Sequence, residues 1–463
     1  MIPVSVREQN DIRFHIRRVQ IGRRIAGDER VDQNRFSIRF DADNRMAMVA
    51  DFHRHISPFH SHDSPPFAHF LLFLPVHLQT ARFLVRSKWT TVKKGRNGTM
   101  NKRLQAFSSW LQQQHSSFAF VTSSANVFYL SGFRCDPHER LLALLVFPDG
   151  EPALVCPQME VPRARRSGFG HTVIGYDDSA DPWEEIERHL KARGVKAVSI
   201  AVEKNDLSFA RFERLSALFP NAQWLDAEEK LRQLRLIKDE QEMKALRQAA
   251  ELADKAVEIG VSAIRPGVTE LELVAVIEYE LKKLGVEGMS FPTTVLAGAK
   301  SADPHGVPGT AAVAPGDFVL FDLGVIVDGY CSDITRTVVC QTASDEQRLM
   351  YDTVRRAQQA AIDACRPQTA MKEIDRSARN VIEQAGYGDY FTHRVGHGLG
   401  IEIHEYPSLH GANNKPLAPG MVFTIEPGIY VPSIGGVRIE DDVAVTDHGV
   451  EVLTSFSKEL IIV

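Results

Sequence analysis

The feature that most constrains this chain is a set of charged or imidazole side chains within apolar sequence: Asp322, Asp333, His397, Glu426 and Glu440. Each lies in a short segment with the composition of a strand or of a strand end. A charge in such a segment is costly unless it is paired or bound to a metal. Four carboxylates gathered at one place would repel each other severely unless cations neutralised them. The set therefore predicts a fold that brings distant strands to one carboxylate-rich site.

The ligand types indicate which ions such a site would hold. Carboxylates with one imidazole suit Mn²⁺, Co²⁺ or Zn²⁺, whereas a structural zinc site would be expected to use cysteines. A pair of divalent ions would offset the carboxylates, and a two-metal site is a hydrolytic device. We therefore expect two divalent metal ions per subunit and a hydrolytic reaction.

Two of the aspartates belong to one predicted hairpin. Asp333 follows Asp322 by eleven residues, and the sequence Asp328-Gly329 lies between them. A turn at Asp328-Gly329 would bring both carboxylates to one place. Alone, two aspartates prove little, because a solvated hairpin is the commoner interpretation.

The segment His393–Glu405 carries three histidines within twelve residues, at His393, His397 and His404. Glycines flank His397, and glycine allows close backbone approach beside a site. A lone histidine is usually structural, but three in a Gly-rich strand and turn indicate a site.

Three further segments complete the candidate set. Glu426 follows an apolar strand, and Arg438 and Glu440 point to the same face of another strand. His305 lies in a loop just before the strand that bears Asp322. A plain salt bridge is the simpler interpretation of Arg438 with Glu440.

Composition separates an N-terminal region from the rest. Residues 1–99 contain 17 Lys and Arg against 9 Asp and Glu and keep no clean hydrophobic period. Lys93–Thr99 can be encoded by a purine-rich stretch that resembles a bacterial ribosome-binding site before the Met100 codon. We therefore predict that residues 1–99 are a non-native or disordered extension and that Met100 is the true start. A basic targeting arm is the competing interpretation.

After Met100 the pattern becomes regular. Strand and helix signals alternate through residues 100–226 and predict a small α/β domain. A charged helical stretch from Ala227 to about Ile264 is expected to be the hinge region. Helices at Glu270–Leu284, Asp345–Ala364 and Met371–Gln384 and several strands follow in the second domain, residues 227–463.

The bulk properties exclude several classes. The body after residue 99 is acidic, which does not suggest a nucleic-acid partner. The five cysteines form no CxxC pair, which favours a reducing cytoplasm and buried thiols over disulfides. The longest apolar run, near Pro66–Leu78, is too short to span a bilayer, so we expect no membrane segment.

Together, the order and spacing of these motifs resemble the pita-bread metallopeptidase family, which includes methionine aminopeptidase, aminopeptidase P and prolidase. The resemblance covers about residues 228–463, and the domain before it looks like the creatinase-type N-terminal domain. Ser332–Thr337 and Arg438–Asp441 look like the proline-specific branch. The implied fold class is α/β, with a creatinase-like N-terminal α/β domain followed by a C-terminal pita-bread (α+β) domain.

The resemblance also implies roles for individual residues. The metal ligands would be Asp322, Asp333, His397, Glu426 and Glu440, with Asp333 and Glu440 bridging two ions, and Mn²⁺ is favoured over Co²⁺ or Zn²⁺.

Other residues would act on the substrate. His305 and His404 would orient it and stabilise the transition state, and Glu426 would shuttle a proton to the leaving nitrogen. His393 would lie near the proline or its carboxylate. Arg438 would support the bridging glutamate or bind the product carboxylate.

The implied activity is metal-dependent hydrolysis of the Xaa-Pro bond in a dipeptide or short peptide, with an Xaa-Pro dipeptidase favoured. Aminopeptidase P, which acts on longer peptides, stays open as an alternative. A creatinase-like metal-free hydrolase and a non-catalytic pita-bread binding protein both lack ligands that are intact here. A homodimer is expected, with His138 either near the partner's site or in a plain surface loop.

Overall fold

The computed structural model describes residues 37–40, 46–49 and 96–463. The chain divides into two units, Met1–Lys88 and Trp89–Val463. In the first, β1 (Ser37–Phe40) pairs antiparallel with β2 (Met46–Val49). Most of the predicted 1–99 extension lies outside the described residues, so its origin stays a prediction.

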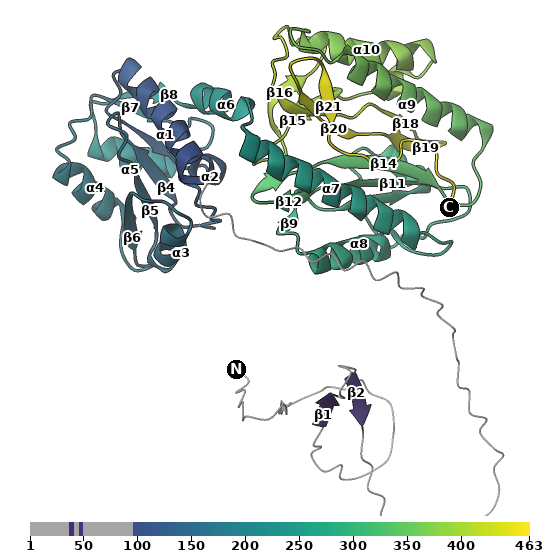
Figure 1. The fold of residues 1–463 in the computed structure, drawn as a ribbon, viewed down its shortest axis with the longest axis horizontal. Coiled ribbons are helices and arrows are strands. Elements are labelled where there is room, and N and C mark those ends of the chain that lie inside the picture. The colour runs from purple at the N-terminus through teal and green to yellow at the C-terminus, as the bar shows by residue number, and fades with distance from the viewer. Residues whose placement is uncertain (1–36, 41–45, 50–95) are drawn as a thin grey trace, which may run out of the picture. The chain divides into compact units, whose positions relative to one another are not determined.

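The second unit begins with a six-stranded mixed sheet in the order β6-β5-β4-β3-β7-β8 (Figure 1). This sheet confirms the predicted α/β character of the region. Its strands are β3 (Phe118–Val121), β4 (Ala143–Val146), β5 (Ala153–Pro157), β6 (Thr172–Tyr176), β7 (Ser199–Val202) and β8 (Gln223–Asp226). Its helices are α1 (Arg96–Gln113), α2 (Ser124–Ser131), α3 (Val161–Arg166), α4 (Pro182–Ala192) and α5 (Phe209–Leu218).

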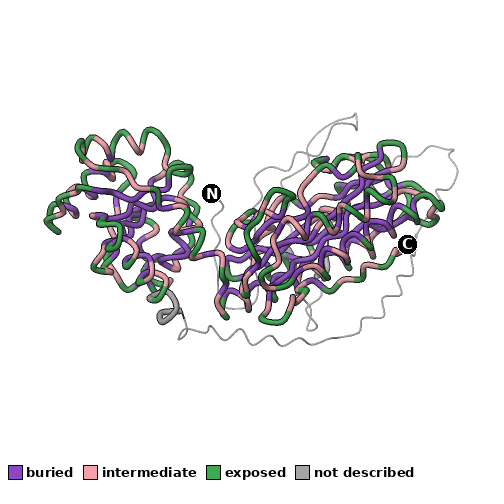
Figure 2. The backbone as a smooth tube through the Cα atoms, turned by 90° about the horizontal axis from the view of Figure 1, so that it is seen from above, coloured by how far each residue is buried: buried purple, intermediate pink, exposed green. Residues whose placement is uncertain are grey.

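The central strands of this sheet are apolar at every position because helices cover both faces. Ala119 and Val121 of β3 belong to one hydrophobic cluster, and Phe118 and Phe120 belong to another. Every residue of β3 is buried, as the purple tube in Figure 2 shows for the strands of both domains. Continuous burial explains why these strands read as unbroken apolar runs rather than as an alternating pattern.

The expectation of one helical stretch from Ala227 to Ile264 is wrong. The structure has two helices, α6 (Glu228–Leu236) and α7 (Glu240–Ala263). The side chain of Asp239 accepts hydrogen bonds from the backbone of Gln241 and Glu242, and Glu242 bonds back to Asp239. This capping box starts a new helix, so the periodic pattern is interrupted just before it.

The C-terminal domain places its strands between two helix pairs (Figure 1). Helices α7 and α8 (Glu270–Leu284) pack on the sheet β10-β11-β14, and α9 (Asp345–Ala364) and α10 (Met371–Gln384) pack against the other strands. The strands of the first sheet are β10 (Thr294–Ala297), β11 (Phe318–Leu323) and β14 (Ile334–Val339). The five-stranded sheet contains β15 (Gly396–Gly398), β16 (Glu405–Leu409), β17 (Val422–Ile425), β20 (Asp441–Val445) and β21 (Val450–Val452), and β18 (Gly428–Val431) pairs with β19 (Gly435–Arg438).

The described residues bear on the cysteines and on the helices, whereas the apolar run Pro66–Leu78 lies outside them. All five cysteines are buried free thiols, as expected for a chain without a disulfide framework. Among the helices of the described ranges, each is too short or too polar to span a membrane.

Candidate metal centre

The predicted hairpin is confirmed. Strand β12 (Val325–Val327) pairs with β13 (Tyr330–Cys331) around Asp328 and Gly329, whose φ angles are 49° and 83°. Positive φ at both central residues is typical of a tight hairpin turn that suits strand twist. The same connection pairs Asp322 with Thr335 between β11 and β14, so both aspartates reach one end of the sheet.

The structure brings the five predicted ligands into one neighbourhood. Ligand atoms of Asp333, His397 and Glu440 all lie within 4.8 Å of one another. His397 Nε2 lies 3.7 Å from Asp333 Oδ2 and 3.4 Å from Glu426 Oε1. Asp322 is turned toward Arg438 and forms an ion pair with it. Its charge still contributes to raising the pKa of Asp333 and of Glu440.

The electrostatics of the protein alone are unfavourable. Burial, followed by repulsion from neighbouring carboxylates, raises the pKa of Asp333 and that of Glu440 well above the usual range. Burial also raises the pKa of Glu426 to about 7, against the favourable charge of Arg438. Asp333 Oδ1 is buried and has no hydrogen-bond partner among the described residues. Divalent cations would satisfy this oxygen and offset the repulsion, so the donor set fits such ions.

The side chain of His397 is neutral, so its Nε2 has a lone pair available for a metal ion. Burial lowers its pKa to about 3, so the ring is neutral at physiological pH. Its Nδ1 lies 3.1 Å from the carbonyl oxygen of Gly398, which favours a proton on Nδ1 and leaves Nε2 facing the carboxylates. The backbone N–H of His397 donates to Thr424 Oγ1 at 3.1 Å, and this bond fixes the strand that carries the ring.

The sequence analysis missed two residues of the site, Thr335, which touches Glu440, and Tyr430, which touches His393 and Arg438. Thr335 Oγ1 donates to Glu440 Oε2 at 2.6 Å and accepts from Arg438 Nε at 3.0 Å. Thr335 lies two positions after Asp333, so strand alternation could have indicated it. Tyr430 is buried in β18, and nothing local distinguishes it from a core aromatic residue.

His393 and Arg438, predicted to bind substrate, are engaged within the protein. Arg438 donates to Thr335 Oγ1 and Tyr430 Oη and forms an ion pair with Asp322. The ring nitrogens of His393 lie 2.8 Å from the carbonyl oxygen of Arg394 and 2.9 Å from Tyr430 Oη. Burial and the charge of Arg438 lower the pKa of His393 to about 4, so this imidazole is neutral. Contact with substrate stays a prediction for both.

His404 and His305 lie on the accessible side of the site. His404 is exposed, and its ring centroid is 4.3 Å from that of His397 at an interplanar angle of 78°. Partial burial lowers the pKa of His404. His305 is exposed in its loop, and its charge contributes to lowering the pKa of His393. Both imidazoles can therefore meet a molecule that enters from solvent.

The fold and the site together define a two-domain metallopeptidase. The chain belongs to metallopeptidase family M24, whose model matches residues 244–447, and the model of the creatinase/prolidase N-terminal domain matches residues 103–237. The recognised family, the fold class and the enzyme class are thus confirmed.

Several similar proteins support this placement. A putative dipeptidase, YkvY of Bacillus subtilis, is 55% identical over 360 residues, which cover 78% of this chain and 99% of that protein. The structure of an Xaa-Pro dipeptidase from Bacillus anthracis matches with a TM-score of 0.73 and 33% sequence identity. The match covers 79% of this chain and 100% of that one. An X-Pro aminopeptidase from Thermotoga maritima has a TM-score of 0.72 and 31% identity over 78% of this chain and 99% of that one.

Proposed function

We propose that this protein hydrolyses the Xaa-Pro peptide bond with two divalent metal ions and that it is an Xaa-Pro dipeptidase. The observation that carries the proposal is the convergence of four carboxylates with a neutral imidazole, including the buried Asp333 Oδ1, which has no hydrogen-bond partner in the part of the chain that the structure describes. The choice of bond is supported by the names of the Bacillus anthracis dipeptidase and the Thermotoga maritima aminopeptidase.

The residues that would hold the ions are Asp322, Asp333, His397, Glu426 and Glu440. Divalent ions held by these residues would lower the pKa of a water molecule and polarise the substrate carbonyl. We propose Mn²⁺ as the native ion, and the oxygen-rich set is compatible with Co²⁺ and Zn²⁺.

Glu426 is the carboxylate that we assign to proton transfer, because its Oε1 lies 3.4 Å from His397 Nε2 at the proposed site. Thr424 Oγ1 donates to Glu426 Oε1 at 3.4 Å and orients the carboxylate. The leaving nitrogen of proline carries no N–H in the peptide and must gain a proton when the bond breaks. We assign this transfer to Glu426.

The exposed imidazoles would act on the substrate carbonyl. His404 stacks edge-on against His397, which places a hydrogen-bond donor beside the ligand set. A donor there can stabilise the oxyanion that forms during attack. His305 would orient the substrate from its own loop, and His393 and Arg438 would form the wall behind the proline.

The second candidate is Xaa-Pro aminopeptidase activity on longer peptides. It is favoured by the Thermotoga maritima structure, whose TM-score of 0.72 nearly equals the 0.73 of the Bacillus anthracis dipeptidase. We further propose a cytoplasmic homodimer and a division of the chain into residues 1–99, 100–226 and 227–463.

The deciding experiment measures proline release by the full chain from an Xaa-Pro dipeptide, and release of the N-terminal residue from an Xaa-Pro-Yaa tripeptide, with and without Mn²⁺. Metal-dependent cleavage of the dipeptide alone is the expected result. Cleavage of both, or of the tripeptide alone, moves the assignment to the aminopeptidase. No cleavage of either peptide by metal-loaded protein refutes the proposed substrate class.

A further inference from the structure

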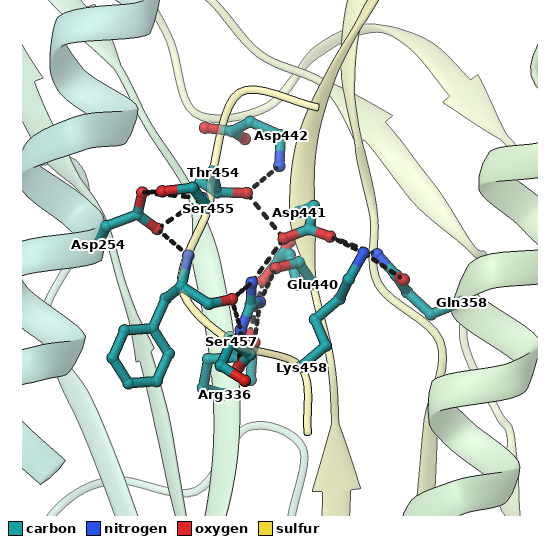
Figure 3. A network of polar contacts seen from close by, with 12 residues as sticks. Asp254, Arg336, Gln358, Glu440, Asp441, Asp442, Thr454, Ser455, Ser457 and Lys458 are labelled. Atoms are coloured by element: carbon teal, nitrogen blue, oxygen red, sulfur yellow. Dashed lines mark hydrogen bonds and ion pairs between the residues drawn. The ribbon is translucent and has the colours of Figure 1, made fainter. Parts of the chain in front are cut away.

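We propose that the segment Thr454–Lys458 positions the metal ligands Asp333 and Glu440, through a buried network centred on Asp441 (Figure 3). The Asp441 network consists of Arg336, Gln358, Asp441, Thr454 and Lys458. The proposal rests on the proposed function only in that Asp333 and Glu440 bind metal. Residues of the Asp441 network would thus act on the metal centre without contacting a metal ion.

Hydrogen bonds hold the backbone of the two ligands, Asp333 and Glu440. The N–H of Asp333 donates to Asp442 Oδ2 at 3.0 Å. The N–H of Glu440 donates to the carbonyl oxygen of Thr335 at 3.1 Å, and its own carbonyl oxygen accepts a hydrogen bond from Arg336 Nη1. Asp442 and Arg336 therefore fix the main chain at both ligands.

The carboxylate of Asp441 is fully buried. It accepts from Arg336 Nη2 at 2.7 Å, Gln358 Nε2 at 2.7 Å, Thr454 Oγ1 at 2.8 Å and Lys458 Nζ at 2.9 Å. Two cations and two neutral donors thus hold one anion in a fixed place next to Glu440.

Further hydrogen bonds tie the segment Thr454–Lys458 to the rest of the domain. Arg336 also donates to the carbonyl oxygen of Phe456 at 2.7 Å from Nη2 and to that of Ser457 at 3.2 Å from Nε. Asp254 on α7 accepts from the N–H of Phe456 at 2.8 Å and from Ser455 Oγ at 2.6 Å. The segment is therefore held between α7 and β20, the strand that begins directly after Glu440, as Figure 3 shows.

A positioning role explains this network better than a contribution to stability alone. Burying an ion pair such as Arg336 with Asp441 adds little net stability, because desolvation offsets the attraction. Fixing the ligands does require such contacts, since the carboxylates repel one another and would otherwise separate. Partners behind metal ligands typically change metal affinity by about 10- to 100-fold.

The test uses the full chain and three substitutions. Lys458→Met removes a cation from Asp441, and Asp254→Ala releases the segment from α7. Glu459→Gln is the matched control, because its carboxylate pairs with Arg355 at 3.3 Å on the surface and is 77% exposed. Mn²⁺ affinity is measured by calorimetry, and site geometry is followed by the visible absorption of the Co²⁺-loaded protein.

We expect roughly tenfold weaker Mn²⁺ binding and an altered Co²⁺ spectrum for Lys458→Met and Asp254→Ala, and no change for the control. Lys458→Arg, which keeps the charge and donors, should restore most of the affinity. Parent-like affinity and spectrum in the folded variants would overturn the proposal. If Lys458→Met or Asp254→Ala does not fold, the milder Lys458→Gln and Asp254→Asn, each of which removes only the charge, decide in the same way.

These readouts need no peptide. A parent chain that binds Mn²⁺ but cleaves no Xaa-Pro peptide refutes the proposed function and leaves the positioning role standing. A parent chain that cleaves peptides, with variants that bind Mn²⁺ equally well, refutes the positioning role alone.

Discussion

The two domains of this protein bury carboxylates in opposite ways. In the N-terminal domain, Glu203 is 1% exposed and accepts hydrogen bonds from the N–H groups of Thr122 and Ser123 and from Asn126 Nδ2, at 2.5, 3.0 and 2.6 Å. In the C-terminal domain, Asp333 is 5% exposed, yet its Oδ1 has no partner among the described residues. A buried carboxylate surrounded by donors is complete within the fold, whereas an unpartnered one indicates a site for a cation.

Asp441 shows that depth and proximity to the site are not the distinguishing properties. It is as buried as Glu440 and directly follows it in the chain. Its charge, however, is offset by Arg336 and Lys458. Among the described residues no Lys or Arg pairs with Asp333, whereas two such cations pair with Asp441, and this difference can be read only from the folded structure.

The largest effect is expected from removing the charge of one of the buried carboxylates that would bind metal in the C-terminal domain. Glu440→Gln removes a ligand charge, and the loss of metal-assisted catalysis is expected to lower kcat/KM by at least about 10³-fold. Metal content by elemental analysis and proline release measure the two consequences. Near-normal metal content with normal turnover would show that Glu440 is not a ligand.

A smaller effect is expected at the edge of the site. His404→Ala should lower kcat by roughly 10²-fold, because a donor to the developing oxyanion is lost. The metal content should stay at the parent level, since the other ligands are intact. A change confined to KM would instead place His404 in ground-state binding.

The third prediction concerns the metal-free protein and its pH dependence. Because burial raises the pKa of Glu426 from 4.5 to about 7, the folded state holds its proton at higher pH than the unfolded chain. The resulting stabilisation is fully present below pH 4.5 and is lost as the pH rises through 7. Glu426→Gln should therefore raise the free energy of unfolding of metal-free protein at pH 8 by about 3 kcal/mol, and by less at pH 5. Chemical unfolding with a chelator present measures it, and equal effects at both pH values would contradict this account.

The smallest effect is expected where the carboxylate is satisfied. Glu203→Gln keeps the shape but weakens the charge-assisted bonds to Thr122 and Ser123, at a cost of about 1–2 kcal/mol in unfolding free energy. Metal affinity and kcat should not change. An altered metal affinity would mean that the two domains do not separate structural from functional carboxylates as proposed.

The sequence predicted several elements well because their ends carry local signals. Helices α8 and α9 begin after Thr269 and Ser344, each of which forms a capping box. The break at Ile237–Asp239 was missed because the same signal, Asp239 with Glu242, lies within a charged stretch that keeps helical spacing on both sides. Local pattern alone could not decide between one helix and two.

The candidate ligands were also predictable, since charges in apolar strand segments are conspicuous. The residues that support those ligands and the rest of the site were not predictable. Tyr430 reaches His393 and Arg438 only because β18 pairs with β19, and Asp442 reaches Asp333 only because β14 lies beside β20. These contacts depend on the register and packing of distant strands, for which no local sequence signal exists.

The position of the Asp441 network has a consequence for the time at which the protein becomes active. Glu440, Thr454 and Lys458 follow every other residue of the site in the chain. At synthesis rates of roughly 5–20 residues per second, about 7–27 s separate the emergence of Asp322 from that of Lys458. During this interval the growing chain carries most of the site but cannot close it. A peptidase assembled in this order cannot complete its active site before Lys458 has been synthesised.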